Sequence, residues 1–119
     1  MRNFRKYDVW KDAIELVDLV YELLKSFPPE ERFVLASQMS RSAISIPSNI
    51  AEGASRDSEK DFKRFIVIAL GSAYELETQV IIALKRGFIS ESKSVNLISN
   101  IQSIQKRLHG LKKKLVSNH

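Results

Sequence analysis

The chain has 119 residues, of which 44% are hydrophobic and 28% are charged, a size and balance typical of one water-soluble globular domain. The absence of cysteine excludes disulfides, thiolate metal sites and thiol nucleophiles. The formal net charge is +5, and no segment approaches the roughly 18 uncharged residues of a membrane span. We therefore expect a single cytoplasmic domain over residues 1–119, with no cofactor and no membrane association.

The first helix is predicted over residues 8–27, where apolar residues recur at intervals of three and four. They form two adjacent rows: Val9, Ala13, Leu16, Val20, Leu23 and Phe27 in one, and Trp10, Ile14, Val17, Tyr21 and Leu24 in the other. Two rows make an apolar face wide enough for more than one neighbour. This helix is expected at the centre of a bundle or at an interface with another subunit. Pro28 should end it, since proline disfavours helical geometry in the residue before it.

The second helix is predicted over residues 29–52, with Gly53 as its stop. Its apolar row consists of Ala36, Met39, Ala43, Ile46 and Ile50. Pro47 lies inside this helix and removes one backbone hydrogen bond. We expect a kink or a local break between Ala43 and Pro47.

The third helix is predicted over residues 58–87, capped by Asp57 or Ser58 and ended by Gly87. Gly71 and Ser72 lie at its centre, where small side chains predict the closest crossing with another helix. The fourth helix is predicted over residues 91–116, with apolar residues continuing to Leu115. Four helices joined by short connections predict an all-α fold, an antiparallel up-down-up-down four-helix bundle.

Basic residues gather near both ends of the sequence, and no acidic residue follows Glu91. A basic surface of this kind can attract RNA or DNA through phosphate contacts, although a solvated face that keeps the protein soluble is an equally good interpretation. Few aromatic residues are available for base stacking, since Trp10 belongs to an apolar row. The candidate nucleic-acid-binding residues are Arg2, Arg5, Lys6, Lys106, Arg107, Lys112, Lys113 and Lys114.

A second set of polar residues follows one side of the second helix. These residues recur at intervals of three and four and form a polar stripe opposite the apolar row. The stripe consists of Gln38, Arg41, Ser45, Asn49, Glu52 and Arg56, with Ser48 beside it. One interpretation is contact with a ligand or nucleic acid. The favoured interpretation is structural: Asn49 and Glu52 satisfy backbone groups freed by Pro47 and by the helix end, and Arg41 or Arg56 balances Glu52.

No arrangement of residues indicates catalysis. His109 and His119 lack the carboxylate three residues earlier that bundle metal sites use, so no metal ligand is assigned. Glu75 and Glu77 point to different sides of a helix and cannot act as an acid and base pair. The sequence contains no phosphate loop, dinucleotide fingerprint or nucleophile elbow. We assign no catalytic residue and expect a protein that is not an enzyme.

The sequence resembles the four-helix-bundle proteins encoded by intervening sequences of bacterial 23S ribosomal RNA genes. The resemblance covers nearly the whole chain and rests on Val9-Trp10-Lys11, Gln38, Arg41-Ser42-Ala43, Ser45-Ile46-Pro47, Asn49 to Gly53, Arg56, Gly71-Ser72, Glu75-Leu76-Glu77, Gln79 and Gly87. Many relatives carry basic residues where this chain has Ser40 and Leu70, which weakens any basic surface built from those positions. By analogy with related accessory proteins of retroelements, the resemblance implies a ring-shaped homopentamer that binds nucleic acid and a reverse transcriptase.

Two functions remain open on the sequence. The leading hypothesis is a non-catalytic, homo-oligomeric module that binds nucleic acid, RNA before DNA, by largely electrostatic contacts. The alternative is a homo-oligomeric scaffold that binds another protein and no nucleic acid, in which the basic residues serve solubility.

Overall fold

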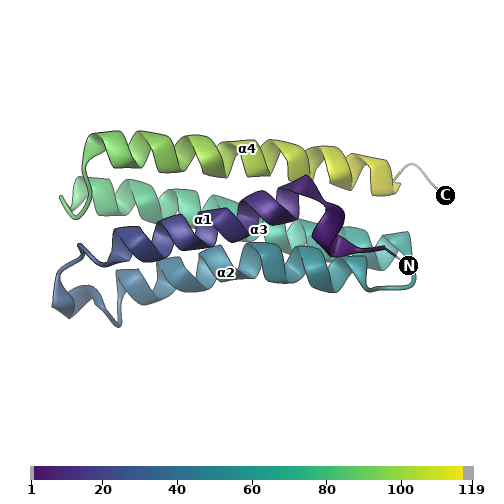
Figure 1. The fold of residues 1–119 in the computed structure, drawn as a ribbon, viewed down its shortest axis with the longest axis horizontal. Coiled ribbons are helices and arrows are strands. Elements are labelled where there is room, and N and C mark those ends of the chain that lie inside the picture. The colour runs from purple at the N-terminus through teal and green to yellow at the C-terminus, as the bar shows by residue number, and fades with distance from the viewer. Residues whose placement is uncertain (1, 117–119) are drawn as a thin grey trace.

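The apolar rows of the sequence meet in one core between four long helices (Figure 1). The computed structural model describes residues 2–116. The helices are α1 (Asp8–Leu24), α2 (Leu35–Ala54), α3 (Glu59–Lys85) and α4 (Glu91–Val116), with short 3-10 turns η1 (Phe4–Lys6) and η2 (Pro29–Glu31). Successive helices run in opposite directions, and the described residues contain no strand. The predicted all-α, up-down-up-down four-helix bundle is therefore confirmed.

The four helices form a ring of contacts around the core. α1 packs against α2 and α4, and α3 packs against the same two helices, whereas the backbones of α1 and α3 do not approach each other within the described residues. α1 and α3 therefore lie diagonally across the bundle, and their outer sides face in opposite directions. The molecule measures 48 × 22 × 20 Å, so its two ends are well separated.

Each helix contributes one apolar row to the core, as its periodicity predicts. On α1, only one of the two predicted rows is fully buried, the row that contains Ala13, Leu16 and Val20. The other row lies along the side of α1 and leaves Ile14 and Tyr21 39% and 50% exposed. α1 is therefore not central, an apolar strip remains on the outside of the bundle, and the predicted alternative of an interface with another subunit stays a prediction.

Several predicted helix ends shift in the structure. α1 ends at Leu24 rather than at residue 27, although Phe27 still packs into the core. The second helix does not begin at residue 29: Pro29–Glu31 form a 3-10 turn, and α2 starts at Leu35 after Val34, whose backbone is not helical. Pro28 and Pro29 fix the backbone of this turn, and residues 32–34 then carry the chain to the start of α2.

The two ends of α3 follow their predicted caps. The Ser58 hydroxyl accepts a hydrogen bond from the Asp61 backbone N–H, and α3 starts at Glu59. α3 ends at Lys85, and Gly87 has φ of +77°, the left-handed conformation that glycine adopts without strain. The Phe88 backbone N–H donates to the Ala83 carbonyl across this turn, which closes the end of α3.

The predicted local break at Pro47 and the predicted crossing at Gly71 are wrong, whereas the alternative of a kink at Pro47 stays a prediction. α2 continues without interruption through Pro47, whose ring is buried in the bundle. Gly71 faces outward, and a Cβ atom added there would meet no atom within 4 Å. The close approach lies at Gly53, where an added Cβ would come within 2.8 Å of the Phe65 Cβ atom. Gly53 therefore serves helix packing inside α2 and does not end the helix.

α3 is unusually apolar for a helix that has one side exposed to solvent. It is long and apolar enough to cross a membrane by length and composition alone, with a mean hydropathy of 1.5 over 18 residues. Only 39% of that segment is buried in the bundle. The rest of α3 includes Val67, Ile68, Ile81 and Ile82, each more than 40% exposed. α3 is thus a core helix that also presents an apolar outer side.

Candidate nucleic-acid interface

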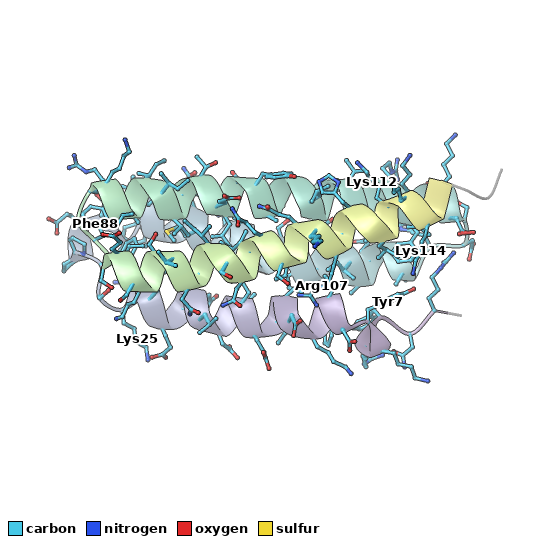
Figure 2. All side chains as sticks on the ribbon, turned by 90° about the horizontal axis from the view of Figure 1, so that it is seen from above. Tyr7, Lys25, Phe88, Arg107, Lys112 and Lys114 are labelled. Carbon is cyan, nitrogen blue, oxygen red and sulfur yellow. The ribbon has the colours of Figure 1, made fainter. Side chains whose placement is uncertain are left out.

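The antiparallel topology brings distant basic residues to one end of the bundle. The chain start, the α2–α3 connection and the end of α4 all lie there, and Figure 2 shows Tyr7, Lys112 and Lys114 at the end opposite Lys25 and Phe88. This basic end holds 13 of the 19 basic residues and six of the 14 acidic ones. Its basic residues are Arg2, Arg5, Lys6, Lys11, Arg56, Lys60, Lys63, Arg64, Lys106, Arg107, Lys112, Lys113 and Lys114.

The eight candidate residues from the sequence therefore belong to one surface region. Five basic residues of this end are not among the candidates predicted from the sequence: Lys11, Arg56, Lys60, Lys63 and Arg64. The last three occupy the first turns of α3, in a segment rich in acidic residues. Their position could have been inferred from the topology: in an antiparallel bundle, the start of the third helix lies beside the end of the fourth. The net positive charge of the basic end is larger than the net charge of the whole chain, because the residues outside this end carry a small net negative charge.

The arginines of the basic end are held by contacts within the chain. Arg2 donates to the Arg56 carbonyl oxygen at 2.7 Å and lies 4.9 Å from the Phe62 ring centre. Arg56 pairs with Glu52 at 2.8 Å and stacks over Phe65. Arginines fixed in this way tie the chain start to the α2–α3 connection and have limited freedom to follow a ligand.

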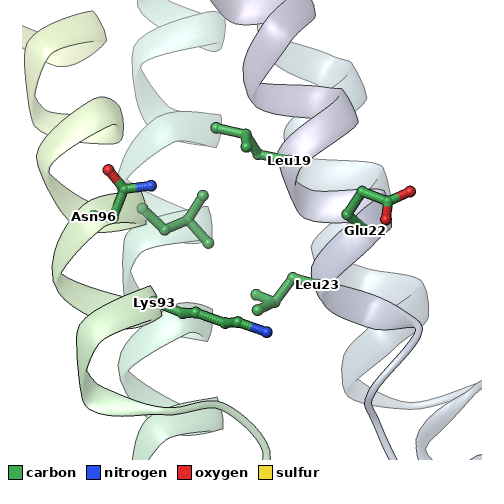
Figure 3. A pocket seen from close by; sticks show the side chains of 6 residues that line it. Leu19, Glu22, Leu23, Lys93 and Asn96 are labelled. Carbon is green, nitrogen blue, oxygen red and sulfur yellow. The ribbon is translucent and has the colours of Figure 1, made fainter.

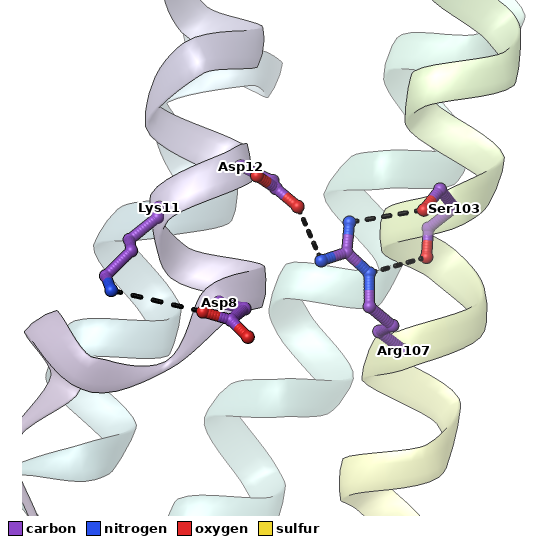
Figure 4. A network of polar contacts seen from close by, with 5 residues as sticks. All are labelled: Asp8, Lys11, Asp12, Ser103 and Arg107. Carbon is purple, nitrogen blue, oxygen red and sulfur yellow. Dashed lines mark hydrogen bonds and ion pairs between the residues drawn. The ribbon is translucent and has the colours of Figure 1, made fainter.

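Arg107 also has a structural contact (Figure 4). Its guanidinium group pairs with the Asp12 carboxylate at 2.6 Å and donates to the backbone carbonyl and hydroxyl oxygens of Ser103. Asp12 lies on α1, so this ion pair joins α1 to α4. Both side chains are partly exposed, so we expect a stabilisation of at most about 1 kcal/mol. Arg107 contributes positive charge to the basic end but is already partnered.

The lysines of the basic end are less constrained than its arginines. Lys6, Lys106 and Lys113 are exposed, and no ion pair within the described residues holds their ammonium groups. They come from η1 and from two successive turns of the outer side of α4. Flexible, solvated ammonium groups suit contact with phosphates as point charges.

The aromatic residues beside the basic end pack against the core. Phe4 and Trp10 contact each other edge to face with ring centres 5.0 Å apart, and Tyr7 contacts Phe62 in the same manner. All three N-terminal rings are half-buried. Base stacking on them would require them to leave these contacts, so phosphate contacts are the main chemistry that this end offers.

The polar stripe lies on α2 along its boundary with α3. The Asn49 side-chain amide donates to the Ser45 carbonyl oxygen at 2.8 Å and to the Ser45 hydroxyl at 2.9 Å. The same hydroxyl lies 2.8 Å from that of Ser72 on α3. The carbonyl freed by Pro47 is that of Ala43, so Asn49 does not satisfy it, whereas the expected pairing of Arg56 with Glu52 is present. At the other end of the stripe, Gln38 and Arg41 are exposed.

Two small pockets lie along the boundary between α1 and α4 and share Leu19. Figure 3 shows one of them, where Leu19, Glu22 and Leu23 of α1 face Lys93 and Asn96 of α4. Farther along, acidic residues of α1 face Asn100, Ser103 and Arg107. Both pockets have acidic groups on their α1 side, so they do not extend the basic end.

The described residues hold no group of three or more histidine, cysteine, aspartate or glutamate side chains that could bind a metal. His109 contacts Tyr74 on α3, with 2.8 Å between the ring nitrogen and the phenol oxygen. Glu77 accepts hydrogen bonds from Gln102 and Gln105 of α4. His119 lies outside the described residues. His109 and Glu77 therefore have structural partners on neighbouring helices.

Comparison with known proteins identifies the family. Residues 5–110 match the family described as 23S rRNA-intervening sequence protein. A crystal structure of a protein with unknown function from the S23 ribosomal protein family of Bacteroides thetaiotaomicron VPI-5482 is similar, with a TM-score of 0.82 and 27% identity, and the match covers 88% of this chain and 95% of that one. No curated protein matches the chain. Because the family match spans most of the sequence, the chain belongs to the 23S rRNA-intervening sequence protein family.

Proposed function

We propose that this protein is a non-catalytic, homo-oligomeric module that binds nucleic acid, RNA before DNA, at its basic end. The observation that carries the proposal is the gathering of 13 of the 19 basic residues at one end of the bundle. Three separate segments supply them, and three of the lysines are exposed and unpaired within the described chain. Such a surface attracts a polyanion and reads little base sequence.

The proposed mechanism is electrostatic. The partnered arginines fix the shape of the basic end, and the exposed lysines neutralise phosphates and release their counterions. With three phosphate contacts, affinity for single-stranded RNA should fall roughly 20-fold between 50 and 200 mM salt. An affinity that came from aromatic stacking would fall much less over the same range of salt concentration.

A titration of fluorescently labelled single-stranded RNA at these two salt concentrations tests the proposal. We expect binding at 50 mM salt with the steep loss given above, and a similar loss for DNA of the same length. No binding at low salt would remove the nucleic-acid function.

The rival function is a scaffold that binds a protein partner and no nucleic acid. The apolar strip on α1 and the apolar outer side of α3 support it, since both surfaces suit protein contacts. The same surfaces support the homo-oligomer in the leading proposal, for which the family resemblance suggests a ring of five. An oligomer that fails to bind RNA at low salt would favour the scaffold.

A further inference from the structure

The boundary between α2 and α3 contains a cavity lined by polar side chains. It has a volume of about 460 Å³, and its walls carry a guanidinium group, a carboxylate, an amide and three hydroxyl groups. We define this polar cavity by Gln38, Arg41, Ser42 and Ser45 of α2 with Ser72 and Glu75 of α3. A cavity of this size accommodates a small molecule.

The polar cavity has one positive and one negative group, and neither is neutralised. Arg41 lies on α2 and Glu75 on α3, both are exposed, and neither forms an ion pair within the described residues. A guanidinium group binds a carboxylate through two parallel hydrogen bonds, and a carboxylate accepts hydrogen bonds from an ammonium group. The polar cavity therefore suits a ligand that carries both a carboxylate and an ammonium group.

A second cavity, with largely apolar walls, adjoins the polar cavity at Gln38. It has a volume of about 260 Å³, and both Gln38 and Gln79 line it. Glu31 and Arg86 also line it and together add no net charge. We define this apolar cavity by Gln79 and the four apolar side chains of its walls, Val34, Leu35, Ile82 and Phe88. Such walls suit the apolar side chain of a ligand whose charged groups lie in the polar cavity.

Gln79 gives a second, independent indication of a ligand. Only 5% of this residue is exposed, and its Oε1 atom is buried without a hydrogen-bond partner among the described residues. An unsatisfied buried acceptor lowers stability, and an apolar side chain in its place would avoid that loss. A ligand that places an N–H or O–H group in the apolar cavity would supply the missing donor.

The spacing of these groups along α3 fits a single ligand. Gln79 follows Glu75 by four residues, so it lies on the same side of the helix and about 6 Å farther along. A tyrosine or tryptophan side chain has a comparable length and ends in a ring that carries a donor. One molecule of this kind can therefore reach both Glu75 and Gln79.

From these observations we propose that the two cavities together bind a free aromatic amino acid whose ring carries a hydrogen-bond donor. Arg41 binds the carboxylate, Glu75 binds the ammonium group, and Gln79 accepts the hydrogen bond from the ring. This site goes beyond the proposed function and does not depend on it. Phe88 of the apolar cavity lies at the end of the bundle opposite the basic end (Figure 2).

Calorimetric titration of the wild-type chain with L-tryptophan and three analogues tests the proposal. L-phenylalanine lacks the ring donor, tryptamine lacks the carboxylate, and indole-3-propionate lacks the ammonium group. We expect L-tryptophan to bind about fivefold more tightly than L-phenylalanine and about tenfold or more tightly than the other two. No binding of L-tryptophan at millimolar concentration, or equal affinities for all four compounds, would overturn the proposal.

Substitutions of the two charged residues connect each ligand group to its partner. The Arg41→Gln variant should lose the preference for L-tryptophan over tryptamine, because it lacks the partner of the carboxylate. In the same way, the Glu75→Gln variant should lose the preference over indole-3-propionate. The control variants Arg5→Gln and Glu15→Gln change residues outside both cavities and should keep both preferences. A preference that persists in the corresponding cavity variant would contradict that contact.

A substitution of Gln79 guards against variants that fail to fold. Gln79→Leu replaces an unsatisfied buried amide with an apolar side chain, so thermal stability should stay the same or rise. This variant should bind L-tryptophan and L-phenylalanine with equal affinity, whereas the wild type distinguishes them. A folded Gln79→Leu variant that still prefers L-tryptophan would contradict the role of Gln79.

Discussion

At the scale of single residues, Gly53 occupies the closest contact between α2 and α3. An added Cβ atom would lie 2.8 Å from the Phe65 Cβ atom and 2.9 Å from the Phe62 Cδ1 atom. We expect Gly53→Ala to lower the free energy of unfolding by about 1–3 kcal/mol, because the overpacking exceeds the gain in helix propensity. Urea unfolding followed by circular dichroism measures this change.

Gly110→Ala is the matched control, since Gly110 also lies inside a helix but has open space around it. It should raise the free energy of unfolding by up to about 1 kcal/mol. If the two substitutions shift stability in the same direction, the close approach at Gly53 is not the reason for that glycine.

The glycines also show which features of single residues the sequence can predict. The sequence reveals a glycine in a helix but not which atoms surround it, so the close helix contact predicted at Gly71 lies instead at Gly53, and Gly71 faces outward. Gly87 was predictable, because a glycine after the last turn of a strongly periodic helix indicates a left-handed cap from local geometry alone.

Substitution of Asn49 tests whether the polar stripe is structural. Its amide bonds to Ser45, whose hydroxyl in turn meets that of Ser72 on α3. We expect Asn49→Ala to lower the free energy of unfolding by about 1 kcal/mol, through the lost hydrogen bonds, and to leave RNA affinity unchanged. Weaker RNA binding by a variant with wild-type stability would assign the stripe to ligand contact.

At the scale of helices, apolar periodicity predicted which residues enter the core, because each row is a local property of 15 to 25 residues. Helix ends were less predictable. The start of α2 depends on how Pro28, Pro29 and Val34 carry the chain across the end of the bundle, which is a tertiary constraint. The absence of a local break at Pro47 has a similar origin, since α2 has buried core residues on both sides of the proline, Ile46 before it and Ile50 after it.

Neighbouring residues of α4 are expected to have different roles. Lys106 is exposed, whereas Arg107 pairs with Asp12 of α1. We expect Lys106→Ala to weaken RNA binding more than Arg107→Ala does, because an unpaired ammonium group is free to meet a phosphate. Arg107→Ala should instead lower the free energy of unfolding, by at most about 1 kcal/mol. RNA titration and urea unfolding of both variants measure this, and the reverse order would contradict the assignment.

At the scale of the whole molecule, the sequence indicated that the candidate site is basic but identified only some of its residues. The candidate residues at the two chain ends were visible as local runs of charge. Lys60 and Lys63 were hidden among acidic neighbours, because only the antiparallel arrangement of α3 and α4 brings them to the same end. The apolar outer side of α3 was equally hidden, since a helical row does not reveal which of its sides the bundle covers.

The most direct test of the account reverses charge at each end of the bundle separately. One variant carries Lys6→Glu, Lys106→Glu and Lys113→Glu at the basic end, and its control carries Lys25→Glu, Arg32→Glu and Lys93→Glu at the other end, so both undergo the same change in net charge. In an RNA titration at low salt, we expect the basic-end variant to lose at least about tenfold more affinity than the control. Equal losses would show that only net charge matters and would contradict a binding surface at the basic end.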